Sequence, residues 1–326
     1  MNTKKYKGKR VCILGHKGYI GSTLKNILRA NYVNVEVSDV DLSNARDIES
    51  QFSSKYYDVI FHLASADLSS IPSNMKERDI DSVVRERSVN CDSILNLHKA
   101  LNAKSHMGKT KIVFTSSTNV YGDIPQQIVG ENTNDNPQTL WQAHKVLSEH
   151  YINILFPNSI SLRIPNIYGI IPHFYYEPIT DTKEYLNKNT YFRPIINKII
   201  RLGIENEKLT LYKNKMCFRD YLHIYDLITA LLVAGVTDGE RKYYTLGCDN
   251  RSTIEDVWNI IAQNLGGIPI EYDDSRKLSD METRSFTSDY TEFRALTGWN
   301  AKYTIRYGIR ETVEQIKRVL KDDSTF

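Results

Sequence analysis

The stretch VCILGHKGYIGSTLKNIL, from Val11 to Leu28, decides the fold. A short apolar run opens it and a glycine-rich turn follows. The apolar residues then recur at spacings of three and four, at Leu24, Ile27 and Leu28, as they do along an amphipathic helix. The stretch therefore predicts a buried strand, a tight turn and a helix in direct succession.

Three glycines, Gly15, Gly18 and Gly21, occupy that turn with G-x-x-G-x-x-G spacing. Glycine there permits a tight turn and lets the backbone approach a pyrophosphate, which the free N–H groups and dipole of the helix N-terminus attract. The next apolar run ends at Asp39, whose carboxylate suits the adenosine ribose hydroxyls and favours NAD. Lys17 argues for NADP, because its ammonium suits a 2′-phosphate. The pattern predicts a dinucleotide site, with NAD preferred and NADP possible.

Further strands and helices alternate along the first half of the chain. Strand patterns occur at 33–39, 58–64 and 111–117, and residues 87–101 read as a helix. This alternation predicts an α/β fold, a Rossmann doubly wound parallel sheet with a smaller, mixed α/β C-terminal substrate domain. We expect a dinucleotide-binding domain at 1–165 with a return segment near 216–250, and a substrate domain from 166–215 and 251–326.

The second half is less regular. Residues 170–192 are rich in Tyr, Pro and polar residues, which suits either a substrate-facing loop or an ordinary surface loop. Order returns at 252–267, where Ser252 and Glu255 have capping-box spacing. An apolar stripe follows and predicts a core-facing helix that ends at a glycine pair; it comprises Ile254, Val257, Trp258, Ile261 and Leu265.

Composition excludes several classes of protein. The chain has 326 residues, 41% of them hydrophobic and 25% charged, with a net charge of only +3. No strong field therefore favours nucleic acid or a membrane, although the N-terminus is basic. The first apolar run is too short for a signal peptide or a membrane span. Four scattered cysteines suit reduced thiols in a cytoplasmic protein and give no zinc pattern; they are Cys12, Cys91, Cys217 and Cys248.

With these residues established, the chain resembles the extended short-chain dehydrogenase/reductase family, the NAD-dependent nucleotide-sugar epimerases and dehydratases. GHKGYIG resembles the cofactor loop, FHLAS the strand beneath the cofactor, SVNCDSILNL the helix with its Asn, and FTSSTNVYG the strand with the catalytic hydroxyl. LRIPNIYG, FRDYLHIYD and TGWNAKYTIRYGIRETV resemble later signatures, so the likeness covers nearly the whole chain.

The resemblance implies roles for particular residues. Ser117 matches the catalytic hydroxyl and Lys145 the catalytic lysine. Thr118, Asn166, Arg219 and Arg284 fall at substrate positions, and arginine suits the diphosphate because its planar fork forms bidentate hydrogen bonds. A surface ion pair is the alternative for the two arginines. The implied cofactor contacts are Gly15, Gly18, Tyr19, Ile20, Gly21, Asp39, Asp41, Leu42, Leu63, Ala64, Ser65, Asn90 and Lys145.

One departure concerns the catalytic tyrosine. The family's Y-x-x-x-K reads Trp141-x-x-x-Lys145 here, with both residues still on one helix face. An indole N–H is only a donor and cannot accept a proton, whereas a phenol with a lowered pKa can. Loss of a positioned acid/base costs roughly a hundred- to ten-thousand-fold in rate, so residual turnover through Ser117, Lys145, His144 or water is compatible with the substitution.

The reaction class narrows by comparison within the family. Related 4,6-dehydratases carry Asp-Glu just after the catalytic hydroxyl, where this chain has Thr118 and Asn119. GDP-fucose-synthase relatives carry a Cys that has no match here. We therefore expect redox at one sugar carbon: 4-epimerisation, 4-keto reduction or dehydrogenation, in surface-polysaccharide sugar biosynthesis. The rival hypothesis is a non-catalytic NAD- or nucleotide-sugar-binding protein. Relatives often pair through helices matching 88–102 and 141–156, so a homodimer is expected.

Overall fold

The computed structural model describes residues 3–66, 80–103, 108–170, 194–212, 216–239, 243–267, 269–275 and 284–322. Two compact units form, and each is described by itself. The first comprises Met1–Gly122, Asn134–Arg163 and Ala230–Tyr244, and the second Asp123–Thr133, Ile164–Thr229 and Thr245–Phe326. In this division the segment that returns to the first unit is Ala230–Tyr244.

A six-stranded sheet forms the centre of the first unit, in the order β10-β6-β4-β3-β1-β2. Its strands are β1 (Arg10–Leu14), β2 (Asn34–Ser38), β3 (Val59–His62), β4 (Lys111–Ser117), β6 (Ser159–Ile164) and β10 (Tyr243–Thr245). β1 pairs in parallel with β2 and with β3, and β3 pairs in parallel with β4. The chain order reverses at β1, the switch point at which such sheets bind ligands. The Rossmann prediction is confirmed.

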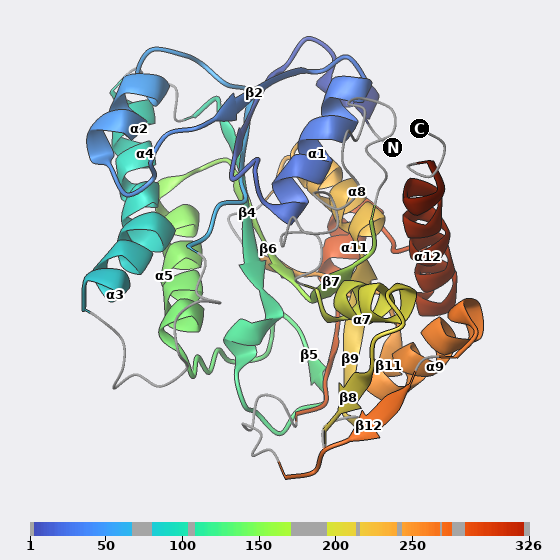
Figure 1. Ribbon diagram of the computed structural model, residues 1–326. Helices are drawn as coiled ribbons and strands as arrows, with labels where there is room; N and C mark the ends of the chain where they lie inside the picture. The colour runs from blue at the N-terminus through green and yellow to red at the C-terminus, as the bar shows by residue number, and fades with distance from the viewer. Residues whose placement is uncertain are drawn as a thin grey trace. The chain divides into compact units, whose positions relative to one another are not determined.

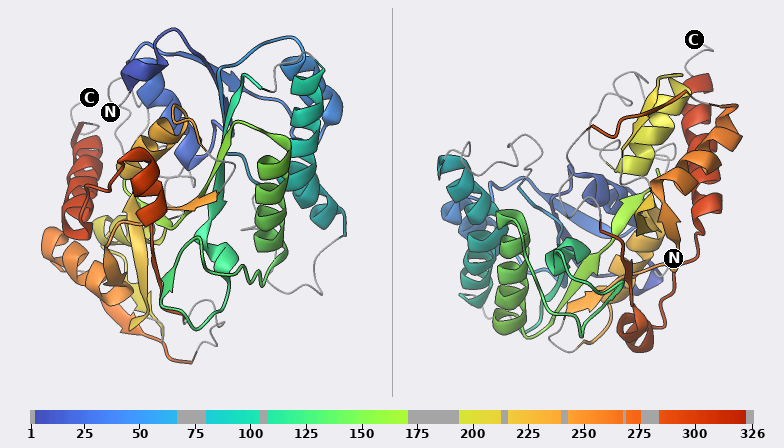
Figure 2. Two further views of the ribbon diagram at one scale, coloured as in Figure 1. Left: turned by 180° about the vertical axis from the view of Figure 1, so that it is seen from behind. Right: turned by 90° about the horizontal axis from the view of Figure 1, so that it is seen from below.

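Helices cover both faces of this sheet. α2, α4 and α5 lie on one face and α1 on the other, as the two opposite views show (Figures 1 and 2). The bounds are α1 (Tyr19–Ala30), α2 (Ala45–Phe52), α3 (Ile80–Arg87), α4 (Ser93–Asn102) and α5 (Leu140–Leu155). The helix α8 (Ile224–Ala234) belongs to this unit only from Ala230 onward. Short turns are η1 (Thr3–Tyr6), the π-helical η3 (Ser88–Asp92) and η4 (Thr118–Tyr121). The helix expected at 87–101 is thus α4 preceded by a π-turn.

Apolar side chains from β1, β3 and β4 pack against those of α2, α4 and α5. The apolar strand residues of this cluster lie at 0–2% exposure because both faces of a doubly wound sheet are covered. This burial explains why the strands read as continuous apolar runs rather than alternating ones. The cluster includes Cys12, Ile60, Ile112, Phe114, Phe52, Leu97, Leu101 and Ile152.

The second unit combines three small sheets with helices. A three-stranded sheet has the order β11-β9-β7, and two-stranded sheets pair β12 with β8 and β13 with β5. The strands are β5 (Ile128–Val129), β7 (Asn166–Tyr168), β8 (Leu209–Leu211), β9 (Phe218–His223), β11 (Arg251–Thr253), β12 (Ile270–Tyr272) and β13 (Thr287–Ser288). The helices are α7 (Ile195–Ile204), α9 (Ile254–Leu265), α11 (Thr291–Thr297) and α12 (Ile305–Asp322). No helix among the described residues is long and apolar enough to cross a membrane.

The start of α9 corrects the expected capping box. Ser252 lies inside β11, opposite Arg219 of β9, so its backbone is committed to the sheet. The cap is Thr253: its Oγ1 accepts from Asp256 N at 3.0 Å, and Asp256 Oδ2 accepts from Thr253 N at 2.9 Å. The capping-box prediction was one residue early because strand pairing extends to Thr253. The stripe after it does face the core, with Val257, Trp258 and Ile261 buried.

Candidate functional site

The glycine turn lies between β1 and α1. Gly15 has φ +85°, and a Cβ placed there would lie 2.7 Å from the backbone of Ala64. A Cβ on Gly21 would overlap the carbonyl of Gly15. Gly18 is the N-cap of α1, meets only Gly15 O at 3.4 Å, and has no side-chain cap. Two glycines thus permit close packing, while Gly18 leaves the N-terminus of α1 without a side-chain cap, as the expected pyrophosphate contact requires.

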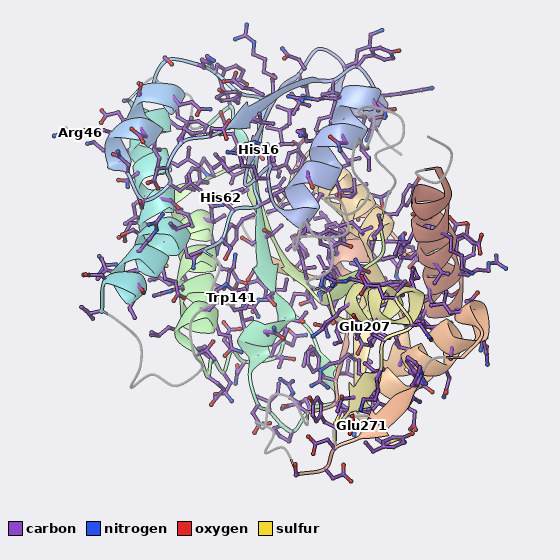
Figure 3. The ribbon with its side chains drawn as sticks, viewed as in Figure 1. His16, Arg46, His62, Trp141, Glu207 and Glu271 are labelled. Atoms are coloured by element: carbon purple, nitrogen blue, oxygen red, sulfur yellow. The ribbon has the colours of Figure 1, made fainter. Side chains whose placement is uncertain are left out.

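Asp39 follows β2 and pairs with the glycine turn. Lys17 Nζ lies 2.5 Å and His16 Nε2 3.6 Å from Asp39 Oδ1, with Lys17 and Asp39 mostly exposed. The hydrogen bond from Lys17 lowers the pKa of the Asp39 carboxyl. The two residues that argued for different cofactors therefore form one ion pair. Figure 3 labels His16 beside this turn.

Asp41 and Leu42 come next, and each has a structural partner. Asp41 Oδ1 accepts from Ser43 N at 2.9 Å and from Ser43 Oγ at 2.7 Å. The Ser43 hydroxyl and N–H lower the pKa of the Asp41 carboxyl. Leu42 packs, partly buried, against the core beneath α2 and α4. These contacts fix the backbone just after β2, where both residues were expected to approach the cofactor.

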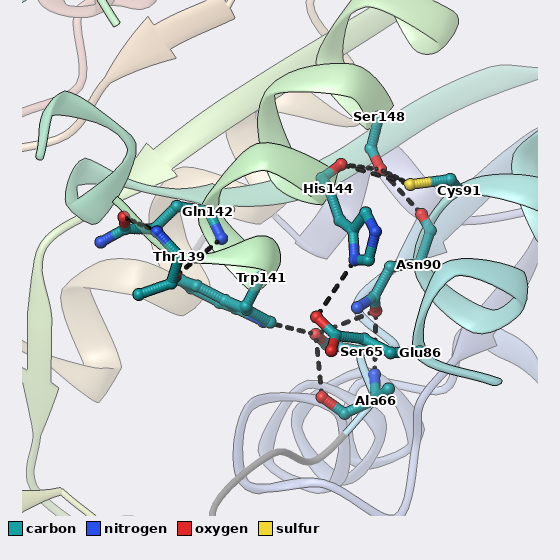
Figure 4. Close-up of polar contacts among 10 residues, drawn as sticks. All are labelled: Ser65, Ala66, Glu86, Asn90, Cys91, Thr139, Trp141, Gln142, His144 and Ser148. Carbon is teal, nitrogen blue, oxygen red and sulfur yellow. Dashed lines mark hydrogen bonds and ion pairs between the residues drawn. The ribbon is translucent and has the colours of Figure 1, made fainter. Parts of the chain in front are cut away.

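The segment after β3 is held by Asn90 of η3. Asn90 is 2% exposed, and its Oδ1 accepts from Ser65 Oγ at 3.2 Å and from Ala66 N at 2.9 Å. Its carbonyl accepts from Ser148 Oγ of α5 at 2.7 Å. Figure 4 shows these contacts converging from α5, η3 and the loop after β3. Asn90 thus positions Leu63–Ala66, the segment expected beneath the cofactor.

Lys145 and Ser117 lie where the sheet meets α5. The ammonium of Lys145 donates to Thr115 O at 3.0 Å, and the residue is 4% exposed. Burial lowers the pKa of Lys145 to about 8. Ser117 Oγ accepts from Asn119 N at 3.1 Å and so caps η4. Thr118, expected at a substrate position, is only 2% exposed.

Trp141 lies one helical turn before Lys145, on the α5 helix that a Thr139–Gln142 capping box begins. Its Nε1–H donates to Ser65 Oγ at 3.1 Å, and Lys145 Nζ lies 5.8 Å from the indole ring centre. Figure 4 shows the indole directed toward Ser65. At the position where a catalytic tyrosine was expected, the chain therefore has an indole N–H that is already hydrogen-bonded to Ser65.

His144 was one candidate for moving the proton. Its Nδ1 lies 3.1 Å from Oε1 of Glu86 on α3, and both side chains are buried. Figure 4 shows the ring turned toward Glu86. His144 is therefore engaged with α3, and the carboxylate that engages it had no signal in the sequence, since Glu86 lies 58 positions away.

In the second unit, two arginines meet over one aromatic ring. Cζ of Arg284 lies 4.4 Å and Cζ of Arg219 5.1 Å from the ring centre of Phe286. Arg284 is 6% exposed, and none of its side-chain nitrogens has a hydrogen-bond partner in the part of the chain that the structure describes. Burial, and then the charge of Arg219, lower the pKa of Arg284 to about 10. Arg284 is therefore too buried for the surface ion pair that was the alternative for it.

A pocket of about 560 Å³ adjoins Arg219. Asn166 of β7 lies on its wall, with apolar side chains from α7 and β8. Further polar groups line it that sequence analysis did not single out, because helix and strand patterns do not show which polar residues share a cavity; they include Lys198, Lys208, Thr210 and Tyr212. The structure thus brings Asn166 and Arg219 to one pocket. Of the Tyr-rich stretch at 170–192, only Ile170 belongs to the described residues.

Comparisons with known proteins show the family of the chain and its fold. The signature of the NAD dependent epimerase/dehydratase family matches residues 11–247. The chain is 25% identical to a UDP-glucose 4-epimerase of Mycolicibacterium smegmatis, over 94% of this chain and 97% of that one. It is 22% identical to a mouse dTDP-D-glucose 4,6-dehydratase, over 91% of this chain and 78% of that one. The crystal structure of Thermotoga maritima UDP-glucose 4-epimerase with UDP-glucose has a TM-score of 0.77 at 20% identity, covering 95% and 99% of the two chains.

The fold and the cofactor turn thus define an extended short-chain dehydrogenase/reductase. The chain belongs to the NAD dependent epimerase/dehydratase family. The family is one of NAD-dependent nucleotide-sugar enzymes, and NAD is the cofactor that its description names.

Proposed function

We propose that this protein is an NAD-dependent oxidoreductase or 4-epimerase of a nucleoside-diphosphate sugar, serving surface-polysaccharide sugar biosynthesis. The observation that carries the substrate class is the Arg219–Arg284 pair over Phe286. The turn at Gly15–Gly21 and the residue Lys145 support the NAD dependence in this proposal.

The arginine pair supports a diphosphate ligand on energetic grounds. Two guanidinium groups that lie close to one ring repel each other, and burial removes the water that would screen them. Arg284 in addition has no acceptor for its donors among the residues that the structure describes. A buried donor without an acceptor costs roughly 1–3 kcal/mol, and more when charged. A diphosphate removes both costs, since its oxygens accept forked, charge-assisted hydrogen bonds.

The adjoining pocket suits the nucleoside. Its volume of about 560 Å³ lies in the range of small-molecule sites, roughly 300–1,000 Å³. Apolar walls from α7 and β8 offer a surface for the base, and Asn166 and Thr210 offer hydrogen-bonding groups. Because Arg219 belongs both to the pocket and to the pair over Phe286, nucleoside and diphosphate would occupy continuous sites.

In the first unit, NAD supplies a hydride acceptor when bound. The chain's own residues must then move the proton of the sugar hydroxyl. Trp141 cannot accept it, and His144 is engaged with Glu86. Lys145 remains the group whose pKa, about 8, lies close to an ordinary working pH, which is the condition for an efficient general base. We propose Lys145 as proton acceptor and Ser117 as the hydroxyl that orients the substrate.

The residues after Ser117 favour redox over dehydration. Elimination of water needs an acid and a base, and the two positions that carry them in dehydratases hold Thr118 and Asn119 here. Thr118 is 2% exposed, and Asn119 donates its backbone N–H to Ser117. Neither side chain titrates in the working range. We therefore place the reaction at a single sugar carbon, with a 4-keto intermediate or product.

Calorimetric titration tests the substrate class. We expect UDP, dTDP or another nucleoside diphosphate to bind the unmodified chain, and Arg284→Met to weaken that binding at least tenfold. Arg251→Met is the matched control, since Arg251 also stacks on a ring, that of Phe218 at 3.5 Å, but is exposed. Absence of binding to every nucleoside diphosphate would overturn the proposal, as would equal losses in the two variants.

Trp141 favours a second candidate function, that of a non-catalytic NAD- or nucleotide-sugar-binding protein. The indole fills the place of the family's proton acceptor and is fixed there by Ser65. Such a protein would bind both ligands and show no change in nicotinamide absorbance with any nucleotide sugar. Steady turnover of any nucleotide sugar by the unmodified chain would exclude it.

We also propose a homodimer formed through α4 and α5. Leu95 of α4 and Leu147 and Ile154 of α5 are large apolar residues exposed on this unit, at 38%, 38% and 68%. Light scattering should give a dimer for the unmodified chain and a monomer for Leu147→Glu with Ile154→Glu. Tyr32→Glu, at another exposed apolar position, should leave the dimer intact. A monomer at every concentration of the unmodified chain would refute the proposal.

A further inference from the structure

The first unit contains a polar pocket of its own, at the end of the sheet opposite the glycine turn. β1 runs from Arg10 to Leu14, and the glycine turn follows its carboxyl end. The pocket instead adjoins the amino ends of β3 and β4 and the chain leaving α8. Its volume is about 420 Å³, and its wall consists of Lys5, Lys9, Asp58, Val59, Lys109, Lys111, Asn158 and Gly235 to Asp238.

Lys111 is the unusual member of this wall. It is 4% exposed, and its Nζ has no hydrogen-bond partner among the residues that the structure describes. Burial lowers the pKa of Lys111 to about 8, and the charge of Asp238 only partly offsets this. A buried ammonium without an acceptor is costly, and such groups are normally paired. Lys111 lines the pocket, and the backbone of Gly239 lies close beside its amine: a Cβ there would be 3.7 Å from Nζ.

Neither aspartate of the wall supplies the missing acceptor. Asp58 Oδ2 already accepts from Arg10 N at 2.7 Å, and its Oδ1 lies 3.4 Å from Tyr56 Oη. Asp238 is exposed, and no hydrogen bond joins it to the Lys111 ammonium in the described part of the chain. Lysines also outnumber aspartates on the wall, so the pocket keeps an excess of positive charge.

The pocket is rigidly built on its sheet side. Asp58 N donates to Arg10 O, Lys111 N donates to Asp58 O, and Ile112 N donates to Asn158 O, each at 2.9 Å. These bonds tie the starts of the neighbouring strands together around Lys111. A preformed, concave, cationic site loses little entropy when it orders an anion.

We propose that this pocket binds a phosphorylated small molecule, with Lys111 as the buried ion-pair partner and Lys5, Lys9 and Lys109 around the phosphate. Several ammonium groups around one cavity match an anion that carries more than one charge, as a phosphate ester or diphosphate does. The concave wall restricts the ligand to a small molecule. The proposal is independent of the reaction proposed above, because every residue in it lies at the opposite end of the sheet.

The test is titration of the full chain with inorganic pyrophosphate, followed by NMR of labelled lysine side chains. We expect the pKa of Lys111 to rise by at least one unit on binding, and the backbone amides of residues 235–239 to shift. Lys111→Met should weaken pyrophosphate binding at this site at least tenfold. Lys4→Met is the matched control, since Lys4 is exposed on the same turn, η1, but does not line the pocket.

Pyrophosphate can also bind at the glycine turn and at the arginine pair. The signals of Lys111 and of residues 235–239 report on this pocket alone and so distinguish it from those two sites. If Lys111→Met does not fold, Lys109→Met with Lys5→Met serves, because both lysines are exposed; we expect at least a threefold loss. An unchanged Lys111 signal at 20 millimolar pyrophosphate, about the weak limit of a specific site, overturns the proposal. Equal losses in Lys4→Met and the pocket variants overturn it too, since they would indicate diffuse surface attraction.

Discussion

The indole N–H of Trp141 donates to the hydroxyl of Ser65 at 3.1 Å. Ser65 Oγ in turn lies 3.2 Å from Asn90 Oδ1, so helix α5, the loop after β3 and the π-turn of η3 are joined by one chain of hydrogen bonds. The tryptophan is therefore fixed at the segment expected to lie beneath the cofactor. Its presence changes the proton chemistry of the site without removing the buried lysine one turn later.

Replacing Trp141 by Tyr should raise turnover. A tyrosine that is ionised beside the ammonium of Lys145 can accept the proton that the indole cannot, and a positioned acid/base contributes roughly a hundred- to ten-thousand-fold. Nicotinamide absorbance with NAD or NADP and a panel of nucleotide sugars measures this. Trp141→Phe is the control, since phenylalanine also lacks an acceptor. A phenylalanine variant as fast as the tyrosine variant would show that bulk, not proton transfer, limits the rate.

Replacing Lys145 by Arg should have different effects in the two backgrounds. In the unmodified chain the variant should lose turnover by at least a hundredfold, because a guanidinium stays protonated and cannot serve as base. In Trp141→Tyr only the positive charge beside the phenol is needed, so the same change should cost less. Rates of all four proteins, measured between pH 6 and 9, give the comparison. Equal losses of turnover in the unmodified chain and in Trp141→Tyr would mean that Lys145 acts only through its charge or its packing and not as a base.

Gly15→Ala should destabilise the first unit far more than Gly8→Ala. Both glycines have positive φ, +85° and +81°, so alanine pays the left-handed backbone cost of about 1–2 kcal/mol at each. Only at Gly15 would the Cβ also press against Ala64, at 2.7 Å, whereas the space around Gly8 is open. Overpacking adds about 1–3 kcal/mol. Chemical unfolding should show the difference, and titration with NAD should show at least a tenfold weaker affinity in Gly15→Ala alone.

Asp220 should make stability depend on pH. It is 1% exposed, and burial raises its pKa to about 6, although Ser288 N donates to its Oδ2 at 2.8 Å. The folded state therefore holds the proton more tightly than the unfolded chain, whose carboxyl has a pKa of about 4. The free energy of unfolding from this group is highest below about pH 4 and falls as pH rises to about 6, by about 2–3 kcal/mol.

Asp220→Asn provides the reference for that measurement, because its amide does not titrate. Unfolding in denaturant at pH 4, 5, 6 and 7 should show the unmodified chain losing stability relative to Asp220→Asn across this range. Other carboxyls titrate there in both proteins and cancel in the difference. Parallel curves for the two proteins would mean that the Asp220 carboxyl keeps an ordinary pKa despite its burial.

Much of the fold was predictable because it is local in sequence. Strands β1 to β4 fall within a few residues of the apolar runs that predicted them, and α9 carries the predicted stripe on its buried side. The predictions were wrong where residues distant in sequence determine the local structure. The cap of α9 is Thr253 rather than Ser252 because β9 pairs with β11 as far as Thr253. The helix expected at 87–101 contains a π-turn that no periodicity showed.

By itself, the sequence determined the strand–turn–helix at Val11–Leu28, the parallel sheet built on it and the types of side chain available for chemistry. Periodicity and glycine placement suffice for these because they depend on neighbours a few residues apart. Only the tertiary structure decided that Arg219 and Arg284 meet over Phe286 and that the Trp141 indole is bound by Ser65. It also decided that Lys111 is buried with no acceptor among the described residues. Those are contacts and burials set by packing of distant segments, and no local pattern encodes them.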